Sequence, residues 1–546
     1  MPALPGSRPL ILELDLAEAP ADPPQGDPVA RFTNRNRHLL RPALRALHEA
    51  ADDRRVVGLV ARVGGSLSWT MAQELRAGVA AFAGSGKPAL AWAETFVDGP
   101  RDLAAYALAS AFPEIWLQPS GGLGLLGVSA QTTFLRGALD KLGVQPELEQ
   151  RYEYKNAVDR ISRTELTPAH RESLERLTGS IFSRALADIA HGRRMTVEHV
   201  RELVETGPRT APEARDARLV DHLGYRDQAY AALRERLPED AELLFADRWK
   251  PRPGLPSLPG RSRGHVALVE VRGDITSGRS RRGPGGRQVG ADTVAAGLRA
   301  ARTDDSARAV LLRVDSPGGS AVASDTIWRE VCRVREAGKP VVVSMGDAAA
   351  SGGYFVACPA DVVVALPATL TGSIGVFGGK FVVADLLERM GLSTGVVEQG
   401  SRARMYSARR PFRPNERERL GAILDGIYAD FVAKVASGRG LSPAAVEAVA
   451  RGRVWSGADA LEVGLVDVLG GLREATRIAR ERAGLAEDAP VQPAGHVPPL
   501  ARLGRPRSSE DPRARLGSAL PQLDDLAAAL GLPGGSELRM PPLTLH

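Results

Sequence analysis

Two hydrophobic patterns alternate along the chain. Short apolar, β-branched runs are followed by longer stretches in which apolar residues recur every three or four positions. The short runs predict buried strands and the longer stretches predict amphipathic helices. In the C-terminal half we expect strands at 265–271, 307–315, 339–346 and 362–367, and helices at 291–304, 323–338 and 415–440. Buried strands that alternate with helices are typical of parallel βαβ units, so the pattern predicts an α/β fold with parallel sheets.

The same pattern occurs twice. The matching pairs are SGKPALAWAE at 85–94 with AGKPVVVSMG at 337–346, GGLGLLG at 121–127 with GSIGVFG at 372–378, and LVDHLGYRDQA at 219–229 with LVDVLGGLREA at 465–475. The matches keep their order and nearly their spacing. Because the period is about half the chain, we interpret it as a duplicated domain rather than a solenoid.

The duplication suggests four parts. We expect an N-terminal domain at 1–248, a linker rich in proline and glycine at 249–264, and a second domain at 265–485. The remaining tail, 486–546, is rich in proline and arginine. Its composition predicts that it is largely disordered, apart from a possible short helix at 523–532.

Composition limits the function classes. The net charge is +6, but basic residues are interleaved with acidic ones and form no block with aromatic residues. We therefore expect no nucleic-acid partner, whereas weak attraction to an anionic membrane surface stays open. Cys332 and Cys358 are the only cysteines. They form neither a disulfide framework nor a metal-ligand pattern, so we expect no metal and no cofactor.

The N-terminal residues predict a short strand rather than a signal peptide. No uncharged apolar run reaches the roughly 18 residues that a membrane span requires. The expected location is therefore the cytoplasm or the periphery of a membrane.

Two glycine-rich turns follow predicted strands in the second copy, DSPGGS at 315–320 and ASGG at 350–353. Ligand sites in open parallel sheets lie at such strand ends. Glycine allows backbone N–H groups to converge there, and convergent N–H groups stabilise an oxyanion. Ser351 follows a strand and starts a helix, which suits a nucleophile. The alternative interpretation is an ordinary serine at a helix N-terminus.

The two copies complement each other at this position. When they are aligned, Leu103 stands opposite Ser351, and Lys155 stands opposite Tyr406. One copy therefore keeps a lysine and the other keeps a serine. A neutral lysine can accept the proton of a serine hydroxyl, but an unperturbed lysine has a pKa of about 10.4. A Ser–Lys pair thus predicts burial of Lys155. The alternative is a surface lysine.

Four motifs together resemble the signal peptide peptidase A family in its long, double-domain form: LRVDSPGGS, GDAAASGGYFVA, LTGSIGV and YKNAVD. The resemblance implies tandem duplicated Clp/crotonase-like ββα domains with parallel sheets. It also implies that Ser351 is the nucleophile and Lys155 the general base. Gly319 and Gly352 would form the oxyanion hole, with Gly318 as a further candidate.

The resemblance covers about residues 10–485. It implies a serine endopeptidase without a cofactor, which degrades apolar peptides such as cleaved signal peptides and assembles as a homotetramer. Long-form relatives in Gram-negative bacteria carry an N-terminal membrane anchor. No such segment is seen here, so three expectations stay open: the protein associates peripherally with a membrane, it is soluble, or the start of the sequence has been placed too late. Two alternatives are a crotonase-like enzyme that acts on acyl thioesters and a non-catalytic scaffold.

Overall fold

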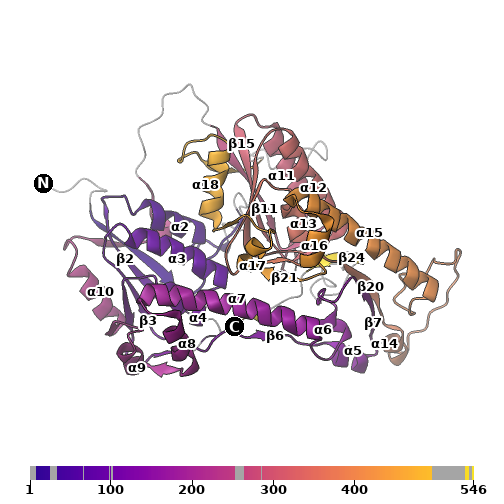
Figure 1. Ribbon diagram of the computed structural model, residues 1–546, viewed down its shortest axis with the longest axis horizontal. Helices are drawn as coiled ribbons and strands as arrows, with labels where there is room; N and C mark the ends of the chain where they lie inside the picture. Colours follow the sequence, from indigo (N-terminus) through magenta and orange to yellow (C-terminus); the bar gives the residue numbers. More distant parts are fainter. Residues whose placement is uncertain are drawn as a thin grey trace. The chain divides into compact units, whose positions relative to one another are not determined.

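The computed structural model describes residues 8–24, 33–64, 67–97, 99, 102–251, 264–283, 286–494, 535–539 and 544–545. The chain divides into two compact units (Figure 1). Unit 1 comprises residues 1–129, 178–261 and 545–546, and unit 2 comprises residues 130–177 and 262–544. The segment 130–177, which lies in the N-terminal half of the sequence, is thus part of unit 2.

A six-stranded parallel sheet forms the centre of unit 1. Its strand order is β10 (Glu242–Phe245), β1 (Leu10–Leu16), β2 (Val56–Val63), β3 (Ala89–Ala93), β4 (Glu114–Leu117) and β9 (His222–Leu223). The helices of this unit include α2 (Leu40–Glu49), α3 (Trp69–Ala83), α4 (Asp102–Ala109), α8 (Val197–Glu205), α9 (Ala211–Asp216) and α10 (Arg226–Arg234). Strands β1, β2 and β3 are almost wholly buried, as expected of parallel strands covered on both faces.

An eight-stranded sheet forms the centre of unit 2. Its main path is β21 (Val454–Ser456), β19 (Leu370–Gly372), β17 (Val341–Ala350), β15 (Ala307–Ser316), β11 (His265–Arg272) and β23 (Val491–Pro493). Off this path, β18 (Val362–Ala365) pairs with β17, and β22 (Val468–Leu469) pairs with β18. All pairs are parallel except β19 with β21. The α/β fold with parallel sheets that the sequence predicts is therefore confirmed.

Helices cover the sheet of unit 2 and bury its core. They include α11 (Ala291–Thr303), α12 (Ala321–Glu336), α13 (Gly352–Ala357), α15 (Pro414–Arg439) and α18 (Leu472–Arg482). Helix α15 begins with a capping box in which Glu416 accepts the N–H of Arg413. Phe431 of α15 is fully buried and packs on Phe355 of α13, with ring centroids 4.7 Å apart. The helix that carries the end of the ASGG motif therefore has a rigid support.

A second sheet of unit 2 mixes strands from distant parts of the sequence. Its order is β13 (Arg281–Gly283), β14 (Gly286–Gly290), β12 (Asp274–Thr276), β16 (Gly318–Ser320), β24 (Gly535–Arg539), β20 (Phe377–Val382) and β7 (Gln145–Gln150). Strand β7 comes from the segment 130–177, and β24 lies close to the C-terminus. Figure 1 shows β7, β20 and β24 next to one another.

The sequence repeat reappears as repeated contacts. The hydroxyl of Tyr106 in unit 1 donates to the carbonyl of Leu219, and the hydroxyl of Tyr354 in unit 2 donates to the carbonyl of Leu465. These contacts link matching motifs of the two copies. They support the alignment from which Leu103 was placed opposite Ser351.

Parts of the expected linker and tail lie outside the described residues, namely 252–263, 495–534, 540–543 and 546. The helix expected at 523–532 falls within the second of these ranges. Three described stretches of the tail form strands: β23, β24 and β25 (Thr544–Leu545). The domain boundaries expected from the sequence stay a prediction.

Candidate active site

Ser351 occupies a strained turn between β17 and α13. Its φ of 55° and ψ of −115° are unusual for a residue other than glycine. Two backbone hydrogen bonds hold it there: its N–H donates to Gly372 O at 2.8 Å, and its carbonyl accepts the N–H of Phe355 at 2.8 Å. The side chain is fully buried. A strained position fixed by its neighbours is a common feature of functional sites.

Lys155 reaches this turn because of strand pairing. Strand β7 pairs antiparallel with β20 over six residue pairs. The chain continues from β7 along unit 2, where the N–H of Arg151 donates to Val376 O and the N–H of Tyr154 donates to Arg451 O. These contacts bring the YEYKNAVD segment to the edge of the ASGG turn. The lysine is thus positioned by backbone pairing rather than by its own side chain.

The structure brings Lys155 and Ser351 into direct contact. Lys155 Nζ lies 2.7 Å from Ser351 Oγ. The same nitrogen donates to the carbonyl oxygen of Ser373 at 2.9 Å and lies 3.0 Å from Ser373 Oγ. Both side chains of the pair are completely buried. The geometry matches a hydroxyl next to a base that a third residue orients.

Burial changes the acidity of the lysine. Lys155 is fully buried, and its desolvation holds the pKa of its amine well below the ordinary value. Its hydrogen-bond partners are hydroxyl and carbonyl oxygens rather than carboxylates. The surroundings therefore favour the neutral amine, which has a lone pair that can accept a proton.

Two glycines, which have no side chain, make room for Lys155. A Cβ on Gly452, whose φ is +86°, would lie 2.5 Å from the backbone nitrogen of Lys155. A Cβ on Gly375 would lie 3.2 Å from Lys155 Cδ. Close by in the sequence, Ala157 and Val158 are buried in a cluster with Phe377. Backbone and apolar groups thus enclose the lysine tightly.

The predicted oxyanion glycines gather beside Ser351. A Cβ on Gly352 would lie 3.2 Å from both Gly318 Cα and Gly319 N, so the two glycine turns touch. Gly352 opens α13, where backbone N–H groups have no partner within the helix. Gly319 has a φ of +150° and passes so close to Ile275 that any side chain would clash.

Gly318 differs from the other two glycines. Its N–H donates to Ser316 Oγ at 3.1 Å. A donor that already has an intramolecular partner is less available to an oxyanion. Gly319 and Gly352 therefore fit the role better than Gly318.

Ser373 is a site residue that we did not single out from the sequence. It has a φ of 52° and provides two of the oxygens near Lys155 Nζ. A signal was present: in the aligned motifs GGLGLLG and GSIGVFG, Ser373 stands opposite Gly122. The serine thus occurs in the copy that also has Ser351.

The residues that align with Ser351 and Lys155 in the opposite copies show no such chemistry. Leu103 is buried in the first turn of the apolar helix α4. Tyr406, opposite Lys155 in the alignment, is 57% exposed. Tyr152, three residues before Lys155, is also exposed. The enclosure of Lys155 comes instead from Ala157, Val158 and the glycines named above.

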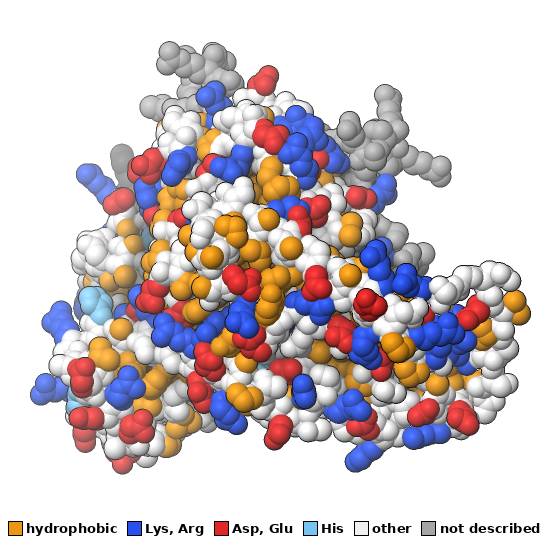
Figure 2. All heavy atoms as spheres, turned by 45° about the vertical axis from the view of Figure 1, so that its right-hand side comes forward, with side chains coloured by type: hydrophobic (Ala, Val, Ile, Leu, Met, Phe, Trp, Pro, Cys, Tyr) orange, Lys and Arg blue, Asp and Glu red, His pale blue; other side chains and the backbone are white. Residues whose placement is uncertain are grey.

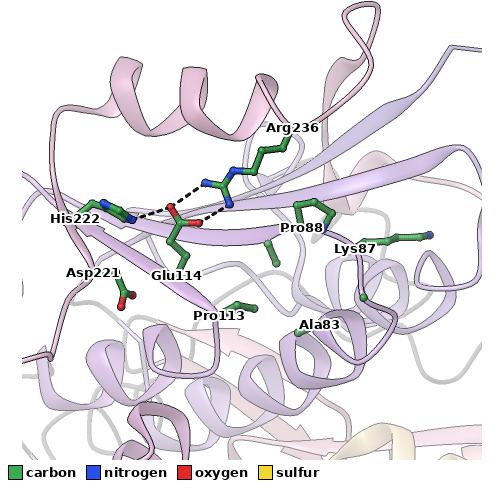
Figure 3. A pocket seen from close by; sticks show the side chains of 10 residues that line it. Ala83, Lys87, Pro88, Pro113, Glu114, Asp221, His222 and Arg236 are labelled. Carbon is green, nitrogen blue, oxygen red and sulfur yellow. Dashed lines mark hydrogen bonds and ion pairs between the residues drawn. The ribbon is translucent and has the colours of Figure 1, made fainter.

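A cavity of about 510 Å³ lies in unit 1 at the start of β3 and β4 (Figure 3). One of the carboxylates that line the cavity, Glu114, pairs with Arg236 at 2.7 Å and with His222 at 3.4 Å. Burial works to raise the pKa of Glu114, but hydrogen bonds from Arg236 and Trp116 bring it below its usual value. Its lining contains no serine, threonine or cysteine. The cavity therefore has no hydroxyl or thiol nucleophile.

Lys87, another residue of that cavity, shows what a structural lysine does in this fold. Its Nζ donates to the carbonyls of Ala50 and Asp53. The matching lysine of the second copy, Lys339, donates to the carbonyls of Ala301 and Asp304. Both lysines tie a helix end to a strand, a role different from that of Lys155.

Surface charge and hydropathy add little to this site. On the face that Figure 2 shows, Lys and Arg side chains are intermixed with Asp and Glu side chains. Among the described residues, no group of His, Cys, Asp or Glu side chains is arranged to hold a metal ion. No helix in the described part of the chain combines the length and apolar character needed to cross a membrane.

Comparison with solved structures gives a distant match. A ClpP1 mutant from Listeria monocytogenes aligns with 39% of this chain and 95% of its own, at 14% sequence identity and a TM-score of 0.26.

Comparison with known sequences gives the family. The profile of peptidase family S49 matches residues 81–238 and 333–486, one match in each copy. "Serine protease SPPA, chloroplastic" from Arabidopsis thaliana is 32% identical over 485 residues, which cover 87% of this chain and 69% of that protein. "Protease 4" from Salmonella typhi is 33% identical over 461 residues, which cover 81% and 72%. The chain therefore belongs to peptidase family S49 and is a serine-type peptidase of the long form, in which the family's domain occurs twice.

Proposed function

We propose that the chain is a serine endopeptidase in which Ser351 attacks the scissile carbonyl and Lys155 is the general base. Its substrates are short apolar peptides such as cleaved signal peptides. The observation that carries this proposal is the buried contact of 2.7 Å between Lys155 Nζ and Ser351 Oγ. A contact at this distance is within reach of direct proton transfer.

The partners of Lys155 fit a neutral amine. A neutral amine has two N–H donors and one lone pair. The two oxygens of Ser373 can accept the two N–H groups, and the lone pair then faces Ser351 Oγ, whose hydroxyl donates to it. Ser373 is thus a positioning residue that orients the lone pair toward the nucleophile.

The reaction follows from this arrangement. Ser351 Oγ forms a bond to the carbonyl carbon of the peptide while its proton passes to Lys155 Nζ. When the tetrahedral intermediate collapses, the C–N bond breaks and the Lys155 ammonium returns that proton to the departing amine. A water molecule then loses a proton to Lys155 and attacks the acyl-enzyme. The released products are the two peptide fragments, and Ser351 regains its proton.

The negative charge that develops on the carbonyl oxygen of the substrate is stabilised by hydrogen-bond donors that are already in place. The N–H groups of Gly319 and Gly352 are the proposed donors, since the two glycines lie side by side next to Ser351. Each such donor contributes about 2.7–4 kcal/mol of transition-state stabilisation in comparable enzymes.

The preference for apolar peptides rests on the resemblance and on the surface next to the glycine turn. Val322, two residues after Ser320, has a side chain that is 71% exposed. An exposed apolar side chain at this place offers one apolar contact to a bound peptide. The homotetramer that the resemblance implies stays a prediction, which analytical ultracentrifugation can test.

The alternatives are less well supported. A non-catalytic scaffold does not require two buried polar side chains within hydrogen-bond distance of each other. A crotonase-like thioester enzyme would use the same pair of glycine N–H groups, but it has no use for a neutral lysine next to a serine.

Hydrolysis of an internally quenched apolar peptide tests the proposal. We expect Ser351→Ala and Lys155→Ala to reduce hydrolysis to the background rate, while the exposed lysine variant Lys141→Ala keeps the wild-type rate. Circular dichroism checks that each variant is folded. Wild-type activity in a folded Ser351→Ala protein would refute the proposal, as would hydration of an enoyl thioester without any peptide hydrolysis.

A further inference from the structure

Tyr154, which directly precedes the proposed base in the chain, is fastened at the end of its side chain. Its hydroxyl donates to Glu172 Oε2 at 2.7 Å. Glu172 lies near the start of α7 (Pro168–Arg193), and its other oxygen pairs with Arg453 Nη2 at 2.9 Å. The Arg453 guanidinium also lies over the rings of Tyr154 and Trp455, 5.0 Å and 4.7 Å from their centroids. We call Tyr154, Glu172 and Arg453 the clasp.

The backbone next to Arg453 holds both sides of the lysine. The carbonyl of Arg451 accepts the N–H of Tyr154 at 3.2 Å. The carbonyl of Arg453 accepts the N–H of Ser373 at 2.7 Å, and the two oxygens of Ser373 lie next to Lys155 Nζ. All of these residues belong to unit 2. A movement of Arg453 would therefore disturb both the segment that carries the lysine and the serine that orients its amine.

The two copies of the sequence differ at this place. An ungapped alignment matches α17 (Gly457–Glu462) with α9, and the two helices begin and end at corresponding positions. In this alignment Arg453 stands opposite Gly207, and Trp455 stands opposite Arg209. The arginine and the tryptophan thus occur only in the copy that contains the proposed nucleophile. A contact needed merely to fold the duplicated domain would be expected in both copies.

Charge and hydrogen bonding support one fixed arrangement of the clasp. The hydrogen bond from Tyr154 lowers the pKa of Glu172 and raises the pKa of the Tyr154 hydroxyl. The carboxylate therefore stays an acceptor and the phenol stays a donor around neutral pH. The neighbouring charges, Arg451 and Glu153, pair with each other at 3.0 Å. An isolated surface ion pair contributes little, but here one carboxylate has two partners and the guanidinium stacks on two rings.

We propose that the clasp holds Lys155 at proton-transfer distance from Ser351, so that Tyr154, Glu172 and Arg453 are positioning residues for the general base. This inference rests on the proposed function, because it takes Lys155 as the base. Loosening the clasp has two consequences. It lengthens the contact between the amine and the hydroxyl, which lowers kcat. It also admits water to the lysine, which raises the pKa of Lys155 toward its ordinary value.

Unit 1 contains a matched control for the clasp. The hydroxyl of Tyr230 donates to Glu13 at 2.7 Å, and Arg226 pairs with the same carboxylate at 3.0 Å. The Arg226 guanidinium lies 4.9 Å from the centroid of the Tyr230 ring. These residues belong to unit 1, whereas Lys155 and Ser351 belong to unit 2. The same substitutions at the two places therefore remove the same kinds of contact.

Hydrolysis of the quenched peptide across a pH series tests the proposal. We expect Tyr154→Phe to lower kcat about tenfold at neutral pH with KM unchanged, less than the roughly 10²-fold cost of a displacement of about 1 Å. Arg453→Lys keeps a charge for Glu172 but cannot stack, and we expect a fall of roughly two- to fivefold. Tyr230→Phe and Arg226→Lys should behave like the wild type. Circular dichroism checks that each variant is folded.

The pH profile distinguishes positioning from a structural role. The base has to be neutral, so kcat rises with pH through the pKa of Lys155. We expect this rise to lie about one pH unit higher in Tyr154→Phe than in the wild type. A variant that merely lowers the folded fraction would lose activity evenly at every pH. An unchanged kcat, or a fall without the shift, would overturn the inference.

Urea unfolding gives a second measurement that does not depend on catalysis. The stability difference between proteins with and without Lys155→Met rises with pH up to about 10.4, because burial lowers the pKa of the lysine. We expect this rise to begin about one pH unit higher in a Tyr154→Phe background, but not in a Tyr230→Phe background. If it does so in a protein that hydrolyses no peptide, the clasp stands and only the peptidase proposal fails. If the backgrounds agree while the wild type cleaves its substrate, the clasp inference is wrong.

Discussion

Lys155 and Ser351 lie in hydrogen-bond contact although 196 residues separate them in the chain. The contact is made within unit 2, because the segment 130–177 joins the second copy through the pairing of β7 with β20. Each copy alone would lack half of the pair. The two residues of the candidate site therefore come from different copies of the duplicated pattern.

Replacing the base with a permanent cation should abolish activity. We expect Lys155→Arg to lower kcat by about 10²–10⁴-fold, because arginine stays protonated and cannot accept the serine proton. Steady-state hydrolysis of the quenched peptide measures this effect. A Lys141→Arg control should behave like the wild type. A Lys155→Arg protein that retains its kcat would exclude lysine as the general base.

The buried lysine should make stability depend on pH. Because burial lowers the pKa of Lys155 in the folded state, the unfolded chain binds more protons between that lowered pKa and about 10.4. Stability therefore rises with pH in this window, by up to about 1.4 kcal/mol per pH unit. Lys155→Met lacks this contribution. We expect the wild type to gain stability relative to Lys155→Met as the pH rises.

Urea unfolding at a series of pH values measures this difference. The exposed variant Lys141→Met should follow the wild type at every pH. Parallel stability curves for the wild type and Lys155→Met across the window would mean that Lys155 keeps an ordinary pKa, contrary to its burial.

Ser373 should matter through the orientation of the lysine. Ser373→Ala removes one oxygen near Lys155 Nζ and leaves the carbonyl in place. A hydrogen bond of about 1 kcal/mol predicts a fall in kcat of about fivefold with little change in KM. The pH at which kcat reaches half its maximum should also shift, which a merely structural role would not cause. Ser407→Ala is the control. An unchanged kcat and pH profile would remove Ser373 from the site.

Alanine variants at two glycines distinguish the effect of backbone strain from the effect of displacing Lys155. Gly452 and Gly464 both have a positive φ, so alanine costs roughly 1–2 kcal/mol of stability at either position. Only at Gly452 would the new Cβ meet Lys155, at 2.5 Å from its nitrogen, whereas at Gly464 the nearest atom lies 3.8 Å away.

We therefore expect Gly452→Ala to lose about 10²-fold in kcat, since a displacement of about 1 Å has that effect on aligned groups. Gly464→Ala should keep its kcat although its own positive φ also costs stability. Thermal unfolding and peptide hydrolysis are measured on the same samples. Equal kcat values in the two variants would show that the position of Lys155 is not critical.

Much of the fold could be predicted from local patterns. The strand expected at 307–315 is β15, and the helix expected at 291–304 is α11. The ends of the elements were predicted less accurately. Strand β17 continues through Ala350, whereas the predicted strand stopped at residue 346. Its last residues pair with β19, a partner that comes later in the sequence. Such pairing extends a strand in a way that local sequence does not reveal.

The site was less visible from local patterns alone. Comparison of the two copies singled out Ser351 and Lys155, because each copy lacks the partner of the other. Ser373 was missed, since its φ of 52° and its contact with Lys155 follow from the tertiary fold. The strand β24 could not be predicted either. Its neighbours β16 and β20 lie far away in the sequence, and the tail's composition suggested disorder.

The pH dependence of nucleophile labelling tests the central claim most directly. A fluorophosphonate probe is reacted with the wild type and Lys155→Arg across pH 6–10, and the modified peptide is identified by mass spectrometry. The account predicts that Ser351 carries the label, that its labelling rate in the wild type rises with pH to a plateau well below about pH 10.4, and that Lys155→Arg is labelled far more slowly. Labelling of another serine, or equal rates in the two proteins, would contradict it.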